Sequence, residues 1–170
     1  MKKLALILSA VFMLQFSILS SAFALGLNDP VYYSKNALSI GGTLEAGQSL
    51  KSNNGTFSLV MQRDGNLVLY KNGGTPIWSV KTDKLMFPAN TLKVGPQIVV
   101  SYTSSFYNSL SWFSDNYKWS IASGRYPEGT EYYGQVMIVQ DDGNVVLYNT
   151  KGTTDQSVWY PVWASDTAGR

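Results

Sequence analysis

A ten-residue phrase that occurs twice restricts the fold of this chain more than any other feature of the sequence. It reads MQRDGNLVLY at 61–70 and VQDDGNVVLY at 139–148. Tryptophans recur about every 40 residues, at Trp78, Trp119 and Trp163, among short strand-like runs separated by Gly, Asn, Asp and Pro. No stretch has the periodicity of an amphipathic helix. The repeat therefore predicts an all-β fold of three sheets, each of four short strands, with these tryptophans in the centre.

The first phrase completes a β-hairpin. Residues 57–62 and 66–70 alternate in polarity, and the loop Arg63-Asp64-Gly65, with its glycine in the left-handed region, is a favoured connection. One face of this hairpin is wholly apolar and must form the core: Phe57, Leu59, Met61, Leu67 and Leu69. The outward face presents Ser58, Val60, Gln62, Asn66, Val68 and Tyr70.

The second phrase predicts the same hairpin in the third unit. Gln140 should lie opposite Asn144, and Val136 opposite Tyr148. The core face then comprises Met137, Val139, Val145 and Leu147. Because two separate hairpins give the same two-faced pattern, this pattern is the firmest structural expectation that the sequence provides.

The outward residues of each hairpin suit a sugar ring. A pyranose carries hydroxyls around its rim and C–H patches on its faces, so its site needs fixed donors, fixed acceptors and an apolar contact. Gln62 and Asn66 each offer a donor and an acceptor, and the Asp64 carboxylate accepts charge-assisted bonds. Tyr70 adds a phenolic hydroxyl, and Val68 is placed to pack on ring carbons.

The pattern Gln-x-Asp-x-Asn-x-Val-x-Tyr, present twice, resembles the mannose-binding motif of the bulb-type (monocot mannose-binding, snowdrop-like) lectins. The likeness covers roughly residues 38–168. It implies a β-prism II fold, in which three four-stranded antiparallel sheets have pseudo-threefold symmetry around central tryptophans. The carbohydrate-binding residues that it implies are Gln62, Asp64, Asn66, Val68, Tyr70, Gln140, Asp142, Asn144, Val146 and Tyr148.

The same resemblance implies a role for each type of residue in the motif. The aspartates and asparagines would bond the axial 2-hydroxyl of mannose, and the glutamines would reach the 3-hydroxyl. The tyrosines would bond the 4-hydroxyl, and the valines would contact ring carbons. The expected partner is a mannose-containing glycan or polysaccharide, with no metal ion and no cofactor.

The middle unit departs from the motif. Counting back from Trp119 places residues 101–109 where a third motif should be, and every liganding residue type is replaced there. We expect the sheet to form without its sugar site. Trp112 and Trp159 fall in irregular segments and either flank a site or pack internally. The aromatic cluster of this unit either fills the middle lobe or forms an exposed patch for a partner: Tyr102, Phe106, Tyr107, Trp112, Phe113 and Tyr117.

The start of the chain predicts a secretory signal peptide, residues 1–24. Lys2 and Lys3 precede a run that is almost wholly apolar, and small residues flank the expected cleavage point after Ala24. The mature chain, 25–170, should then be one secreted domain, extracellular or periplasmic. Its expected lobes are approximately 38–82, 91–123 and 130–168.

Composition excludes several classes of function. Once Lys2 and Lys3 are removed, the basic and acidic residues balance, which argues against nucleic acid as a partner. The chain has no cysteine and no histidine, so Ser-His-Asp and Cys-His catalysis are excluded. Beyond the leader, no stretch of the sequence is apolar and long enough to insert into a membrane.

Two other functions remain as alternatives to a sugar-binding protein. A glycosidase needs two carboxylates about 5 to 9.5 Å apart, and Asp64 and Asp142 are expected on different sheets, so we expect no enzyme activity. A lectin-like bacteriocin or protein-binding module could use the same fold. Weak single sites would favour multivalency, for which a homodimer is one route.

Overall fold

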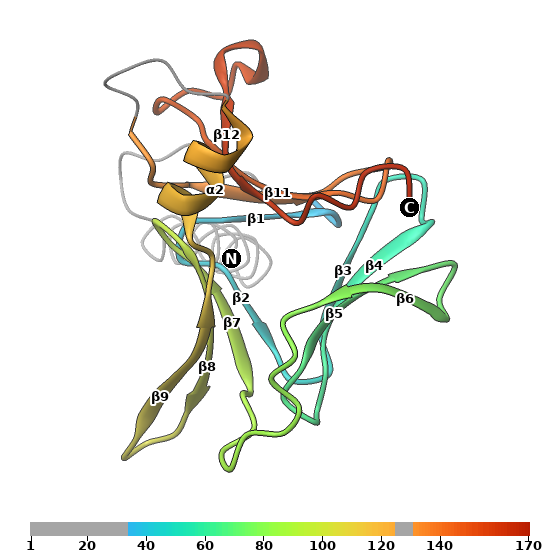
Figure 1. Ribbon diagram of the computed structural model, residues 1–170, viewed down its shortest axis with the longest axis vertical. Coiled ribbons are helices and arrows are strands. Elements are labelled where there is room, and N and C mark those ends of the chain that lie inside the picture. Colours follow the sequence, from blue (N-terminus) through green and yellow to red (C-terminus); the bar gives the residue numbers. More distant parts are fainter. Residues whose placement is uncertain (1–33, 125–130) are drawn as a thin grey trace, which may run out of the picture. The chain divides into compact units, whose positions relative to one another are not determined.

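The described residues of this computed structural model, 34–124 and 131–170, form three four-stranded antiparallel sheets (Figure 1). The first sheet contains β3 (Ser49–Lys51), β4 (Phe57–Met61), β5 (Leu67–Lys71) and β6 (Thr75–Ser79). The middle sheet contains β2 (Thr43–Glu45), β7 (Thr91–Val94), β8 (Ile98–Thr103) and β9 (Asn108–Phe113). The third sheet contains β1 (Ala37–Ser39), β10 (Val136–Val139), β11 (Val145–Asn149) and β12 (Tyr160–Ala164). The predicted all-β prism is confirmed, whereas the predicted signal peptide lies outside the described residues.

Two of the three sheets include a strand from outside the expected lobes 38–82, 91–123 and 130–168. Each repeat supplies three strands, and the fourth comes from the segment 37–51, which gives β1, β2 and β3 in turn to the third, middle and first sheets. Each of these short strands covers an edge that would otherwise expose unpaired backbone groups. The first sheet therefore lies wholly within 38–82, whereas the middle and third sheets each take one strand from outside their lobe.

Trp112, and not Trp119, completes the central tryptophan cluster. The ring centroid of Trp112 lies 6.0 Å from that of Trp78 and 5.6 Å from that of Trp163, and the last two lie 5.8 Å apart, all edge to face. Each ring sits opposite a core residue of the neighbouring strand, at the same place in its sheet. The prediction for Trp119 was wrong because the middle unit contains an inserted helix.

That helix, α2 (Asn116–Ser123), carries Trp119. Asp115 caps its first turn by accepting from the Lys118 N–H over 2.9 Å, and Gly124 ends it in the left-handed conformation with φ of 64°. The expectation of no helix was wrong because α2 is short and has no apolar stripe for the sequence to reveal. No helix among residues 34–124 and 131–170 has the length and apolar character needed to cross a membrane.

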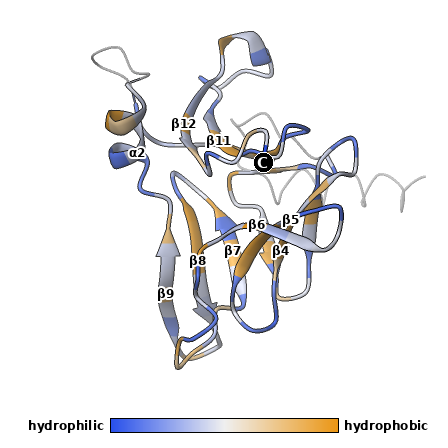
Figure 2. Ribbon diagram, turned by 45° about the vertical axis from the view of Figure 1, so that its right-hand side comes forward, coloured by the Kyte–Doolittle hydropathy of each residue, from blue (hydrophilic) through white to orange (hydrophobic). Residues whose placement is uncertain are grey.

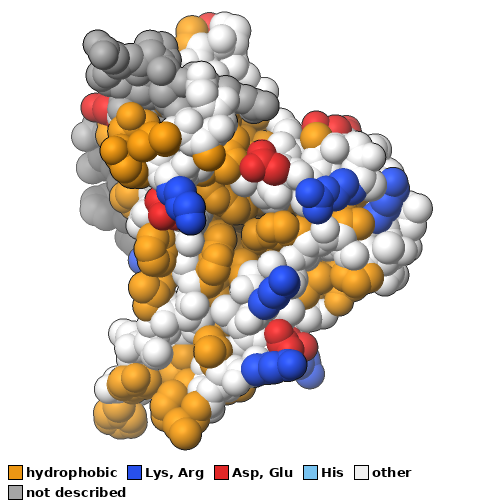
Figure 3. Space-filling view, viewed as in Figure 1, with side chains coloured by type: hydrophobic (Ala, Val, Ile, Leu, Met, Phe, Trp, Pro, Cys, Tyr) orange, Lys and Arg blue, Asp and Glu red, His pale blue; other side chains and the backbone are white. Residues whose placement is uncertain are grey.

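Hydrophobic residues run along β4, β5 and β8 (Figure 2). The aromatic cluster of the middle unit, in contrast, is divided between the core and the surface. Trp112 is partly buried and packs against the core, whereas Phe106 is fully exposed and Tyr107 is 51% exposed. Tyr107 packs on Phe87 and Tyr102, with ring centroids 5.6 and 6.5 Å apart. Figure 3 shows hydrophobic side chains at the end of the β8–β9 hairpin. Trp112 therefore meets the expectation of a packed residue, whereas Phe106 and Tyr107 meet the expectation of an exposed patch.

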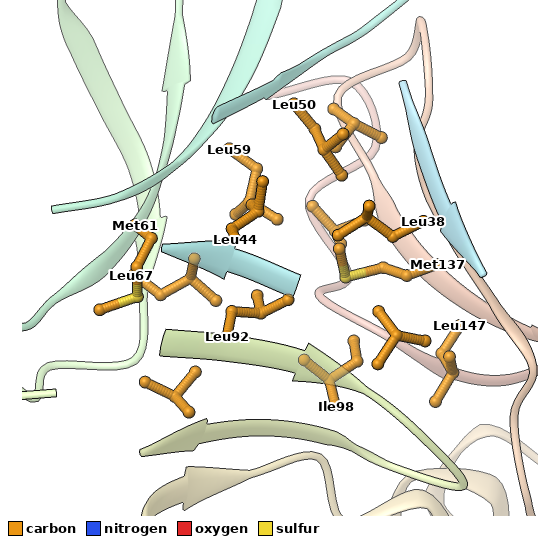
Figure 4. Packing of buried hydrophobic residues seen from close by; sticks show 14 of the residues in the cluster. Leu38, Leu44, Leu50, Leu59, Met61, Leu67, Leu92, Ile98, Met137 and Leu147 are labelled. Carbon is orange, nitrogen blue, oxygen red and sulfur yellow. The ribbon is translucent and has the colours of Figure 1, made fainter. Parts of the chain in front are cut away.

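The apolar faces of the three sheets meet in one core (Figure 4). Leu59, Leu92 and Met137, one from each sheet, have no exposed surface. The core faces predicted for the two hairpins are confirmed, since every residue in them is at most 4% exposed. Burial of one face of each sheet leaves the opposite face of each hairpin for polar side chains.

Candidate functional site

The first hairpin, β4 and β5, has the predicted register. Ser58 pairs with Tyr70, and the Gln62 N–H donates to the Asn66 carbonyl over 2.8 Å. Because alternate residues of a strand point to the same face, Gln62, Asn66 and Tyr70 share the outer face of the sheet. The first-sheet site is the set Gln62, Asp64, Asn66, Val68 and Tyr70.

The hairpin formed by β10 and β11 repeats this arrangement. Val136 pairs with Tyr148, and the Gln140 N–H donates to the Asn144 carbonyl over 2.8 Å. The third-sheet site is the set Gln140, Asp142, Asn144, Val146 and Tyr148. The two sites thus have the same backbone frame as well as the same residues.

Both turns require their glycine. Gly65 and Gly143 have φ of 91° and 88°, in the left-handed region. A Cβ at Gly143 would lie 2.6 Å from the ring of Phe57, and one at Gly65 would lie 2.7 Å from the Ala89 nitrogen. The turns are therefore packed against neighbouring segments, which holds the flanking polar side chains in place.

In both sites the glutamine and the tyrosine bond each other. Gln62 Nε2 donates to the Tyr70 hydroxyl over 2.6 Å, and Gln140 Nε2 donates to the Tyr148 hydroxyl over 2.8 Å. The glutamine Oε1 then remains as an acceptor, and the tyrosine hydroxyl keeps its own hydrogen to donate.

The aspartates fix the turns. Asp64 Oδ1 accepts from the Asn66 N–H over 3.0 Å, and Asp142 Oδ1 accepts from the Asn144 N–H over 2.9 Å. One carboxylate oxygen of each aspartate closes the turn in this way. The other, Oδ2, remains to accept from a ligand.

Two threonines that the sequence did not single out orient the asparagines. The Thr82 N–H donates to Asn66 Oδ1, and the Thr167 N–H donates to Asn144 Oδ1, each over 3.3 Å. The hydroxyl of each threonine also donates to the carbonyl of the turn glycine over 2.6 Å. A common spacing could have revealed them, because each threonine lies four residues after a central tryptophan.

These bonds give each site a defined polarity. The asparagine Nδ2 and the tyrosine hydroxyl are the donors, and the glutamine Oε1 and the aspartate Oδ2 are the acceptors. Because one end of each amide is already bonded to the protein, each amide has a single role toward a ligand hydroxyl. The set matches a ligand with several neighbouring hydroxyls, each of which can both donate and accept.

A pocket of about 460 Å³ opens at the first-sheet site. It is lined by Gln62, Asn66, Val68, Tyr70, Pro76, Trp78, Ser79 and Lys81. Val68 is 4% exposed, so it contributes a small apolar floor rather than a broad face. Asp64 does not line the pocket and lies exposed at the hairpin turn.

The two sites differ in their surroundings. Lys81 of the first sheet and Asp166 of the third both adopt a left-handed conformation, with φ of 60° and 54°. Each lies immediately before the threonine of its site. The first-sheet site therefore has a cation beside it, and the third-sheet site has an anion. Asp166 Oδ2 accepts from the Trp119 indole over 2.9 Å.

Burial raises the pKa of the Tyr148 phenol above its ordinary value of 10.0. The charge of Asp142 raises this pKa further, and the hydrogen bond from Gln140 acts in the opposite direction. The phenol therefore keeps its proton, and so its role as a donor, throughout the neutral pH range.

No protein-family model matches the sequence, and no curated protein matches it. Among solved structures, a lectin from Marasmius oreades matches with a TM-score of 0.57 at 20% identity, over 82% of this chain and 97% of its own. A monomeric monocot mannose-binding lectin from Gastrodia elata matches with a TM-score of 0.54 at 28% identity, over 78% of this chain and 98% of its own. The chain has the β-prism fold of the bulb-type lectins. A mannose-specific lectin from Dutch crocus, Crocus vernus, shares this fold with a TM-score of 0.51 at 22% identity, over 71% of this chain and 94% of its own.

The middle sheet of this bulb-type prism corrects the expected position of the lost motif. The pairings of β8 place Val99 where the first sheet has Val68, and Ser101 where it has Tyr70. Gly95, whose N–H donates to the Gln97 carbonyl, takes the place of Gln62. Residues 101–109, expected at this position, instead form the end of β8, the next loop and the start of β9. The expectation used Trp119 as its reference, and that tryptophan is not the central one.

Among the described residues, no group of three or more His, Cys, Asp or Glu side chains could hold a metal ion. The aspartates of the two motifs lie in the turns of different sheets, as expected.

Proposed function

We propose that this chain is a carbohydrate-binding protein that recognises mannose or mannose-containing glycans at the first-sheet and third-sheet sites, without catalysing a reaction. The observation that carries the proposal is the same donor and acceptor arrangement in two hairpins. The fold shared with the 28% identical mannose-binding lectin of Gastrodia elata supports it.

The polarity of each site suits the hydroxyls along one edge of mannose. The asparagine Nδ2 would donate to the axial 2-hydroxyl, whose hydrogen the aspartate would accept. The glutamine Oε1 would accept from the 3-hydroxyl, and the tyrosine would donate to the 4-hydroxyl. The valine floor would contact ring carbons, and the side chains, already bonded to one another, would lose little freedom on binding.

Affinity at each site should be modest. A few solvent-exposed hydrogen bonds, each contributing about 0.5 to 1.5 kcal/mol net, correspond to a dissociation constant near the millimolar range. Two sites in one chain would raise the avidity for a polymeric glycan, and a homodimer would raise it further.

We predict that Asn66→Ala combined with Asn144→Ala abolishes binding to immobilised mannan, because both sites lose their principal donor. Retention on a mannan column measures the effect, and circular dichroism checks that the sheets remain. Asn108→Ala, at an exposed position of the middle sheet, is the matched control and should bind normally. Full retention of the double variant would contradict the proposal.

We further propose that the chain is exported and cleaved after Ala24, on the strength of the leader-like start of the sequence. N-terminal sequencing of the protein recovered outside the cytoplasm should then begin at Leu25. Recovery of the uncleaved chain in the cytoplasm would exclude export.

The exposed aromatic cluster of the middle sheet favours protein binding as a second candidate function. Phe106, fully exposed, and Met86, 89% exposed, are unusual at a solvated surface. A lectin-like bacteriocin would need such a contact in addition to its sugar sites. Clearing zones on lawns of related bacteria, lost on Phe106→Ala, would support this candidate.

A further inference from the structure

The two sites share a motif, but the residue beside their tyrosines differs. We propose that the third-sheet site has a second subsite, formed by Trp159, and takes two consecutive sugars of an oligomannoside, whereas the first-sheet site takes one. The inference rests on the proposed mannose-binding function and concerns the length of ligand that each site accepts.

The pairings identify the corresponding positions. Lys71 of β5 pairs with Thr75, and Asn149 of β11 pairs with Tyr160, each at the start of the edge strand. The residue just before that strand is Gly74 in the first sheet and Trp159 in the third. The first sheet therefore has no side chain where the third has the largest one.

Trp159 lies against the tyrosine of the motif. Its ring centroid is 6.1 Å from that of Tyr148, with the two planes inclined at 48°. The Tyr148 hydroxyl bonds Gln140 and is the atom that would donate to a sugar in the proposed site. An aromatic surface therefore continues from the end of the sugar site, where the next residue of an oligosaccharide would lie.

A long insertion holds this indole in position. The connection 150–159 replaces the short connection 72–74 of the first sheet. The Trp159 Nε1–H donates to the Thr153 carbonyl over 2.8 Å, and the N–H and hydroxyl of Thr150 both donate to Gln135 Oε1 over 2.9 Å. Asp155 Oδ1 accepts from the N–H and the hydroxyl of Ser157, which caps the short 3-10 helix η1 (Gln156–Val158).

Because the ring is fixed before a ligand arrives, a contact with it requires little further ordering. The C–H face of a sugar is apolar, and an aromatic ring is a common partner for an apolar ligand face. A single mannose in the motif would not extend past Tyr148, so a platform there benefits only a longer ligand.

Two single-site proteins allow the ligand preference of each site to be measured separately. Asn66→Ala leaves only the third-sheet site, and Asn144→Ala leaves only the first-sheet site. Calorimetric titration of each with methyl α-mannoside and with a linear α-mannotriose measures both affinities. The third-sheet site should prefer mannotriose by about fivefold to tenfold, whereas the first-sheet site should bind the two ligands within about twofold.

Adding Trp159→Gly to the Asn66→Ala protein gives the third-sheet site the residue of the first. This change should abolish the preference for mannotriose and leave the affinity for methyl α-mannoside within about twofold. Phe106→Ala in the same background removes an exposed aromatic side chain of the middle sheet and should leave both affinities unchanged.

The Trp159→Gly variant could misfold, so a second measurement uses a protein that retains Trp159. In the Asn66→Ala protein, the indole N–H resonance assigned to Trp159 should shift on addition of mannotriose and stay nearly constant with methyl α-mannoside.

Equal affinity of the Asn66→Ala protein for the two ligands would overturn this inference but not the proposed function. An equal loss of both affinities on Trp159→Gly, or a gain, would also overturn it, because Trp159 would then support or obstruct the mannose site itself. Absence of mannoside binding in the wild-type protein would instead reject the proposed function.

Discussion

At the scale of single residues, each site is set by contacts that the protein makes with itself. Gln62 and Tyr70 bond each other, and Asn66 is held by Thr82, so the remaining donors and acceptors of these groups are fixed before any ligand binds. The sequence predicted the residue types and their common face. It could not predict the polarity, because Thr82 returns to the turn only through the folding of β6.

We predict that Thr82→Val weakens the first-sheet site and Thr167→Val weakens the third. Each change removes the buried hydroxyl that donates to the glycine carbonyl of its turn, and it should lower the free energy of unfolding by about 1 to 3 kcal/mol. Urea unfolding measures the stability, and titration of the two single-site proteins measures the affinity. An equal effect of Thr82→Val on both sites would contradict the local role of this contact.

The raised pKa of Tyr148 predicts the pH dependence of the third-sheet site. Ionisation would remove the hydrogen that the phenol donates, so affinity should stay constant from neutral pH to about 10 and decline only above it. Titration of the Asn66→Ala protein with mannotriose across this range is the measurement. A decline already below pH 9, about one unit under the ordinary pKa, would show that another group controls binding.

At the scale of elements, the hairpins were predictable and their connections were not. Alternating polarity and a turn glycine fix β4 with β5, and β10 with β11, from local sequence alone. The middle unit was misaligned because α2 carries a tryptophan at nearly the repeat interval. Its eight residues have no apolar periodicity, and only the contacts made by Trp112 show which ring is central.

We predict that Trp112→Ala destabilises the protein more than Trp119→Ala. Trp112 packs edge to face on two tryptophans, and truncation of a core tryptophan costs about 3 to 5 kcal/mol. Trp119 also packs against the core, but it lies on α2, outside the three sheets, and bonds Asp166, so its loss should cost less. Urea unfolding of the two variants under one set of conditions gives the comparison, and a reversed order would contradict the central role of Trp112.

At the scale of the whole molecule, the sheets depend on one another. Three tryptophans from three sheets share one cluster, and the turn at Gly143 of the third sheet packs on Phe57 of the first. The repeat in the sequence indicated three equivalent units. It gave no sign that 37–51 would supply a strand to each, because these strands are too short to carry a periodic pattern.

We predict that Gly143→Ala lowers the free energy of unfolding by about 2 to 4 kcal/mol, because the new Cβ meets Phe57 and the backbone is left-handed. Circular dichroism and tryptophan fluorescence should report the same urea midpoint, since the sheets unfold together. Gly74→Ala is the control: nothing lies within 4 Å of its new Cβ, so its midpoint should match that of the wild type. Two separate midpoints would show that the sheets are independent.

The distribution of β1, β2 and β3 over three sheets also sets the order of events during synthesis. Ala37 of β1 pairs with Ile138 of β10, so a strand made early has no partner until most of the chain has followed. Pairings so distant in sequence make folding slow. Such a delay would suit the export that we propose, because a chain whose sheets are still open can be threaded through a narrow channel.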